Sequence, residues 1–233
     1  MLPAYRIGNP KSEHWLGLID GVYAIAMTLL AIEIPGLLGT LFHQYQEHHE
    51  NLGIMGIMLL YELIAYAATF LVLYEFWSFH RAAIVIGGLA RRGQNFINSF
   101  ILVGACLLPG KMAHLIDLKV EFVVEELIQG IATDTAIWKM LTSFPHVAGM
   151  FFLICLFCFL LIGILARSSL KASHSAALTF LANQACLRAT IFGAFALITT
   201  VAWTFSYVFP PIILILSYLI YAFYERADPH LPA

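Results

Sequence analysis

Charged residues are scarce in this chain. Asp, Glu, Lys and Arg make up 11% of its 233 residues, hydrophobic residues make up 61%, and the mean hydropathy is +0.85. Soluble globular domains carry about 25% charged residues, so this composition excludes a soluble protein. It predicts an all-α, polytopic membrane protein that is embedded in the lipid bilayer. No basic run is longer than Arg91-Arg92, so the sequence does not support nucleic acid as a partner, and we predict none.

Catalytic and metal-binding motifs are also missing. The chain contains no G-x-S-x-G, no H-E-x-x-H and no glycine-rich phosphate loop, so we predict neither an enzyme nor a bound cofactor or metal. Cys155 and Cys158 are spaced as C-x-x-C but lie in an apolar run, which favours packing over redox or metal chemistry. His80 and His146 fall on opposite sides of the membrane in the topology predicted below, which argues against a haem enzyme that uses both.

Long apolar segments, in contrast, are abundant. About 20 apolar residues in a helix cover roughly 30 Å of hydrocarbon. Six segments predict a single six-helix transmembrane domain over residues 1–233: about residues 15–35, 52–80, 95–110, 146–166, 187–208 and 210–224. Residues 111–145 form the one long connection, on the extracytoplasmic side. Within it, residues 114–129 alternate apolar and acidic side chains, which suits a helix lying on the membrane surface.

The positions of lysine and arginine predict the orientation. With a cytoplasmic N-terminus, nine of the twelve lie inside, and three lie outside. The inside residues are Arg6, Lys11, Arg81, Arg91, Arg92, Arg167, Lys171, Arg188 and Arg226, and the outside residues are Lys111, Lys119 and Lys139. Cytoplasmic segments are enriched in Lys and Arg, so both termini are predicted to be cytoplasmic.

The first span combines an apolar strip with a carboxylate. At 100° per residue, one narrow strip of the helix holds Leu18, Ile25, Leu29 and Ile32. Asp20 lies about 140° away from Ile25. An ionisable group in a membrane span is costly unless it faces protein or water, so Asp20 is predicted to have a functional or a strongly structural role.

The second span carries a polar stripe. One helical face holds Glu62, Tyr66, Thr69, Leu73 and His80, with Trp77 at its margin. In the predicted topology, His80 and Arg81 lie at the same cytoplasmic depth as Asp20 and as Asn98 in the third span. We therefore predict a structural polar network of Asp20, Trp77, His80, Arg81 and Asn98. Whether this network only locks the helices or also takes part in transport stays open.

The first half of the chain resembles the transmembrane protein 175 family, the endosomal and lysosomal potassium channels and their prokaryotic relatives. The resemblance lies in D-G-V-Y-A-I-A-M-T-L-L-A-I-E-I-P at residues 20–35, W-S-F-H-R at residues 77–81, Asn98, and L-L-P at residues 107–109. The family signature R-x-x-x-F-S-D is only partly kept. Asp20 is present, whereas His14 stands in place of Arg and Leu18-Ile19 in place of Phe-Ser.

The resemblance implies a homotetrameric, potassium-preferring cation channel in a bacterial plasma membrane. Each subunit would contribute its first helix to a central pore that has no carbonyl selectivity filter, and no T-V-G-Y-G sequence occurs here. The constriction would fall on Ile25, Leu29 and Ile32, with Thr28 beside the conduction path. Apolar rings of this kind expel water and so close a pore. The same three residues belong to the apolar strip, and an ordinary lipid-facing or helix-packing surface is the alternative interpretation.

A second hypothesis is a proton- or ion-coupled transporter that uses Asp20, Glu62, Glu75 and His80. Transporters of this class are often built from internal repeats, and we find none by inspection. Saturable flux that depends on a second substrate would favour the transporter, whereas single-channel current steps would exclude it.

Overall fold

The computed structural model describes residues 12–48, 52–88, 92–128, 145–170 and 175–201, together with residue 135. These residues form five long helices: α1 (Ser12–His48), α2 (Leu52–Gly87), α3 (Arg92–Ile128), α5 (Pro145–Leu170) and α6 (Ala176–Val201). Each contains a stretch that is long and apolar enough to cross a membrane. The described residues are thus helical, as expected for the predicted all-α membrane protein, while the sixth helix and the tetramer remain predictions.

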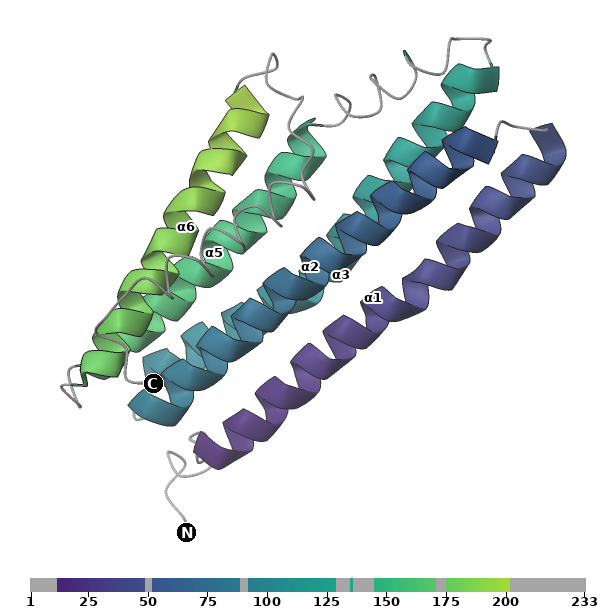
Figure 1. Ribbon diagram of the computed structural model, residues 1–233. Coiled ribbons are helices and arrows are strands. Elements are labelled where there is room, and N and C mark those ends of the chain that lie inside the picture. Colours follow the sequence, from purple (N-terminus) through teal and green to yellow (C-terminus); the bar gives the residue numbers. More distant parts are fainter. Residues whose placement is uncertain are drawn as a thin grey trace.

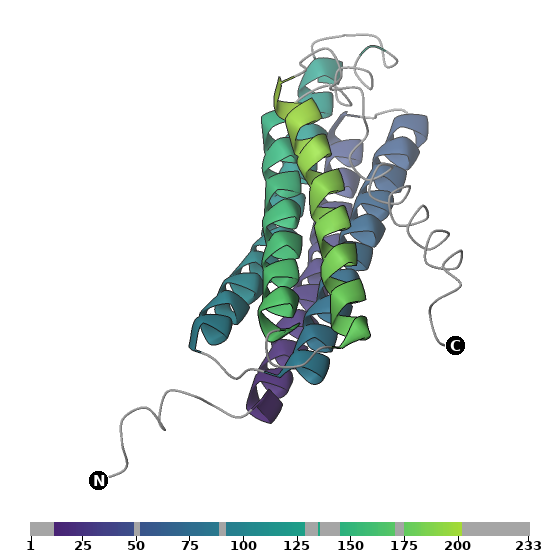
Figure 2. The ribbon, with the colours of Figure 1, turned by 90° about the vertical axis from the view of Figure 1, so that its left-hand side faces the viewer.

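The helices form one bundle in which α1 and α6 lie at opposite edges (Figure 1, Figure 2). α2 and α3 lie between these edges, and α1 packs against both of them. α5 and α6 pack closely along each other, and α5 also packs against α3. Because α1 lies at an edge, one of its faces meets the bundle and the other is open.

An aromatic cluster joins the α5–α6 hairpin to α2. The ring of Phe159 meets Phe76 edge to face, with centroids 4.5 Å apart, and stacks on Phe192 at 5.6 Å. All three side chains are buried. Helices in a bilayer associate by close packing rather than by escape from water, and aromatic pairs contribute about 0.5–1.5 kcal/mol each beyond the area they bury. The cluster therefore helps to fix where these three helices meet.

Two predicted helix ends differ from the structure. The first helix was predicted to end at residue 35 and the third at residue 110, both at a proline, but α1 continues to His48 and α3 to Ile128. A proline removes one backbone hydrogen bond, which long membrane helices tolerate. In α3, Met112, Leu115 and Ile116 follow Pro109 and are fully buried in the core. The predicted connection at 111–145 is thus helical to Ile128, and a separate surface helix at 114–129 is wrong.

The remaining predicted spans shift in a similar way. α2 runs to Gly87 rather than residue 80, and α6 begins at Ala176 rather than residue 187. The start of α6 was missed because Gln184 and Arg188 lower its hydropathy, and the structure gives both of them buried hydrogen-bond partners. The sixth predicted span, residues 210–224, lies outside the described residues.

Gly104 of α3 allows close approach to α5, and Gly104→Ala is expected to destabilise the bundle. A Cβ added there would collide with the Sγ of Cys158. Overpacking of this kind costs about 1–3 kcal/mol, and it is measured as a lower midpoint of thermal unfolding in detergent.

Gly110→Ala on the same helix is the matched control, because nothing lies within 4 Å of a Cβ added there. Combining Gly104→Ala with Cys158→Ala removes the colliding sulfur and should recover most of the loss. No recovery in this double variant would show that the loss has another origin.

Candidate functional site

The site begins with the two faces of α1. Ile19, Tyr23, Ala26 and Leu30 recur every three or four residues and are buried against α2 and α3. Of the 18-residue window that makes α1 a candidate span, 22% is buried, against 44–56% in the other four helices. α1 therefore has the largest open surface of the five described helices.

The predicted pore-lining residues lie on this open face. Ile25 is 61% exposed, Leu29 47% and Ile32 64%. Thr28 is also exposed, and its hydroxyl donates a hydrogen bond to the backbone carbonyl of Ala24 at 2.7 Å. About half or more of each of these three apolar side chains is thus exposed, and the strip is available to a neighbouring molecule or to lipid. Exposed apolar side chains also occur on α3 and α6, so exposure by itself does not distinguish contact with a neighbouring molecule from contact with lipid.

Asp20 is anchored to α2 on the other side of this strip. The indole N–H of Trp77 donates to Asp20 Oδ1 at 2.7 Å, and the Nε of Arg81 lies 3.6 Å from the same oxygen. The Arg81 guanidinium also lies over the Trp77 ring, 5.9 Å from its centroid. The side chains of Asp20 and Arg81 are 45% and 46% exposed. The indole bond is therefore the stronger contact, because it is short, directed and made to a charged acceptor.

A second polar contact centres on His80, three residues after Trp77 on α2. His80 is fully buried on α2, with its Nε2 2.5 Å from the amide oxygen of Asn98 on α3 and its Nδ1 3.4 Å from the hydroxyl of Tyr23 on α1. An amide oxygen only accepts, so Nε2 donates to it and Nδ1 accepts from the Tyr23 hydroxyl. A neutral imidazole thus satisfies both contacts and joins three helices.

The predicted network is therefore divided into two parts in the structure. Asp20 contacts Trp77 and Arg81, whereas His80 contacts Asn98 and Tyr23, and the described residues show no hydrogen bond between Asp20 and either His80 or Asn98. Tyr23 was missed from the sequence. Its position three residues after Asp20, on the buried face of α1, is the signal that could have found it.

Glu62, one of the acidic groups of the transporter hypothesis, lies elsewhere. Glu62 is buried on α2, and its Oε1 has no hydrogen-bond partner among the described residues. Eighteen residues (80 minus 62) separate Glu62 from His80 on the same helix, which amounts to about 27 Å at a rise of 1.5 Å per residue. Glu62 and His80 thus cannot act together in a single ion-binding site.

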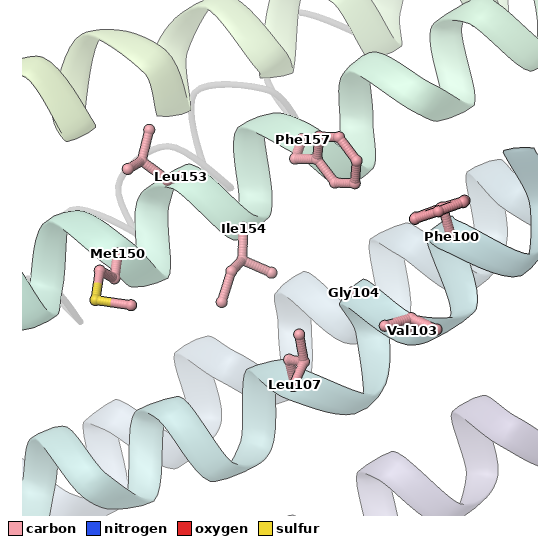
Figure 3. Close-up of a pocket in the computed structure, with 8 residues that line it drawn as sticks. All are labelled: Phe100, Val103, Gly104, Leu107, Met150, Leu153, Ile154 and Phe157. Carbon is pink, nitrogen blue, oxygen red and sulfur yellow. The ribbon is translucent and has the colours of Figure 1, made fainter.

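Two grooves in the surface of the bundle are apolar. The groove between α3 and α5 has a volume of about 270 Å³, and side chains of both helices form its walls (Figure 3). A second, between α1 and α2, lies beside the buried face of α1 and has a volume of about 290 Å³. The first is lined by Phe100, Val103, Gly104, Leu107, Met150, Leu153, Ile154 and Phe157, and the second by Met27, Leu30, Ala31, Leu63, Tyr66, Ala67 and Phe70. The first has no polar side chain to orient a reacting group, and the second has only the Tyr66 hydroxyl.

Long apolar helices joined by buried polar contacts define a helical, multi-pass membrane protein. The family described as endosomal/lysosomal potassium channel TMEM175 matches residues 15–109. The match covers the part of the chain that runs from α1 into α3, and the predicted resemblance to that family is confirmed. This part of the chain contains the apolar strip and both polar contacts of α2. No curated protein and no solved structure matches the chain.

Asn98→Leu is expected to destabilise the junction of α1, α2 and α3. The change removes the acceptor of the His80 Nε2–H and leaves that group unpaired in a fully buried position. A buried donor without a partner costs about 1–3 kcal/mol, which thermal unfolding of the purified protein measures.

Ser99→Ala is the matched control on the neighbouring position. The Ser99 hydroxyl is exposed and donates only within its own helix, to the carbonyl of Asn95 at 3.1 Å. Equal losses of stability in Asn98→Leu and Ser99→Ala would contradict a specific role for the contact between His80 and Asn98.

Proposed function

We propose that this protein is a potassium-preferring cation channel, in which the α1 helices of four identical subunits line a central pore. The family match over residues 15–109 carries this proposal, because it covers α1 and the part of α2 that anchors it. The open apolar face of α1 supports it as well. The contacts of Asp20 and Tyr23 hold α1 to its own bundle, which leaves the opposite face available to other copies of the helix.

The constriction in this proposal consists of Ile25, Leu29 and Ile32. Rings of these side chains around a shared axis would be too apolar to hold water, and a bare ion in such a passage loses the hydration that stabilises it. Conduction then requires the helices to turn or separate until the passage fills with water. The Thr28 hydroxyl donates to its own helix, so only its lone pairs would face the ion.

Selectivity in such a pore would come from its width and from weak coordination rather than from fixed carbonyl groups. We expect the preference for potassium over sodium to be modest for this reason. The expected partners are the permeant ions, the lipid bilayer and the other subunits. We place the channel in a bacterial plasma membrane with both termini in the cytoplasm.

The channel interpretation is favoured over the coupled transporter by one geometric observation. Two of the four groups of the transporter hypothesis, Glu62 and His80, are about 27 Å apart along α2, which is too far for one ion-binding site. His80 is also already bonded on both nitrogens to Tyr23 and Asn98.

The decisive experiment is a current recording from purified protein in a planar bilayer under a potassium gradient, followed by replacement of potassium with sodium. Discrete current steps that reverse near the potassium equilibrium potential are expected. Saturable flux that needs a second substrate, without current steps, would support the transporter instead.

A further inference from the structure

A buried ion pair joins α6 to α2 outside the site described above. Arg188 of α6 is 1% exposed, and its Nε and Nη2 each donate to one carboxylate oxygen of Glu75 at 3.0 Å. Its Nη1 donates to the amide oxygen of Gln184 at 2.9 Å. The guanidinium also lies 4.3 Å from the ring centroid of Phe79. The charge is thus enclosed by a two-pronged salt bridge, an amide and an aromatic face.

Stability alone does not account for this pair. Apolar side chains of similar size often replace a buried ion pair without loss of stability, because removing two charges from water costs about as much as their attraction returns. In some proteins such pairs favour one arrangement of the elements that they join over others. In a membrane span the cost of a charge is higher still, so the expected benefit lies in where α6 sits against α2.

The pair lies on the same two turns of α2 that hold α1. Glu75 faces α6, Trp77 binds Asp20 of α1, and His80 binds Tyr23 of α1. α1 packs against α2 and α3, α5 packs against α3 and α2, and α6 packs mainly against α5 with a smaller contact to α2. A movement of the α5–α6 hairpin can therefore reach α1 through α3 and through α2, and on the α2 route the ion pair lies on the segment that holds α1.

We propose that Glu75 and Arg188 are positioning residues that fix the α5–α6 hairpin to α2 and thereby set the position of α1. This inference rests on the proposed function, because it gives the pair a channel role only if α1 lines the pore. Arg188 lies outside residues 15–109, so the pair makes the second half of the chain part of the gating apparatus.

The test replaces both charges at once, as Glu75→Met with Arg188→Met. Both methionines fill similar space without a charge, so the double variant is expected to fold and assemble, with a lower stability where the Gln184 amide oxygen loses its bond to Arg188. Coupling through such networks changes equilibria by about 2- to 30-fold. We expect the ratio of open to closed time in single-channel records to shift within this range at unchanged unit conductance, because Ile25 and Leu29 are intact.

The controls separate positioning from packing. Leu60→Met with Leu197→Met alters exposed side chains of the same two helices and should leave the open-to-closed ratio unchanged. Arg188→Lys keeps a positive charge beside Glu75 but loses the second hydrogen bond to its carboxylate. The open-to-closed ratio of this variant should lie between those of the wild type and the double methionine variant.

A second measurement does not depend on current. Ala24→Cys, at an exposed position of α1, is labelled with a maleimide in a background that carries Cys106→Ser and Cys186→Ser. The double methionine variant is expected to change the labelling rate by a similar factor. A changed rate in a protein that carries no current would uphold the positioning role and reject the channel. Wild-type values of both the labelling rate and the open-to-closed ratio would overturn the inference.

Discussion

Leu29→Ser is expected to raise the potassium conductance of the channel about tenfold, since a barrier lowered by about 1.4 kcal/mol speeds its crossing by that factor. In the proposed pore, four leucine side chains would be exchanged at once for hydroxyls at one level of the constriction. Hydroxyls hold water in the passage, and the ion then keeps part of its hydration. Single-channel recording measures the rise, and Ile25→Asn should act in the same direction.

The structure offers a close control for this prediction. Leu29 on α1 and Leu153 on α5 are both 47% exposed, so a change to serine removes a similar apolar surface from each within the subunit. Neither residue belongs to the buried core, and folding should survive both changes. Leu153→Ser is expected to conduct like the wild type. If Leu153→Ser raised the conductance and Leu29→Ser did not, the open face of α1 would be a lipid-facing surface.

The residues that face into or away from the bundle could largely be predicted from the sequence. A helix repeats every 3.6 residues, so its apolar and polar faces can be read from residue types alone. This rule put Ile25, Leu29 and Ile32 on one strip and His80 on a polar stripe, and the structure has the strip exposed and His80 buried. Periodicity predicts only which way a side chain faces, because it carries no information about what lies beyond the exposed face.

Helix ends and long-range pairs could not be predicted in this way. Proline and scattered acidic groups normally signal a break, but in α3 the apolar residues after Pro109 find a buried surface and the helix continues. Glu75 and Arg188 are 113 residues apart, and only the packing of α6 against α2 brings them together. The separation of Asp20 from His80 likewise depends on the register between α1 and α2, which no local pattern contains.

Asp20→Ala is expected to cause the largest loss of assembled protein among single changes in the anchoring contacts. A hydrogen bond to a charged group is worth about 1.5–3 kcal/mol, and this change removes the acceptor of the Trp77 indole. Arg81 contributes less, because an exposed ion pair is worth about 0–1 kcal/mol and both side chains are nearly half exposed. Its long side chain can also extend toward the membrane surface when its partner is lost.

This ranking gives four variants with different expected outcomes. Trp77→Phe keeps the ring but removes the N–H, and it should reproduce most of the loss seen with Asp20→Ala. Asp20→Asn keeps an oxygen acceptor for the indole and should retain most of the assembled protein, as should Arg81→Met. Size-exclusion chromatography after purification measures the assembled fraction, and thermal unfolding measures its stability. If Arg81→Met caused the larger loss and Trp77→Phe a small one, the ion pair rather than the indole bond would hold α1 to α2.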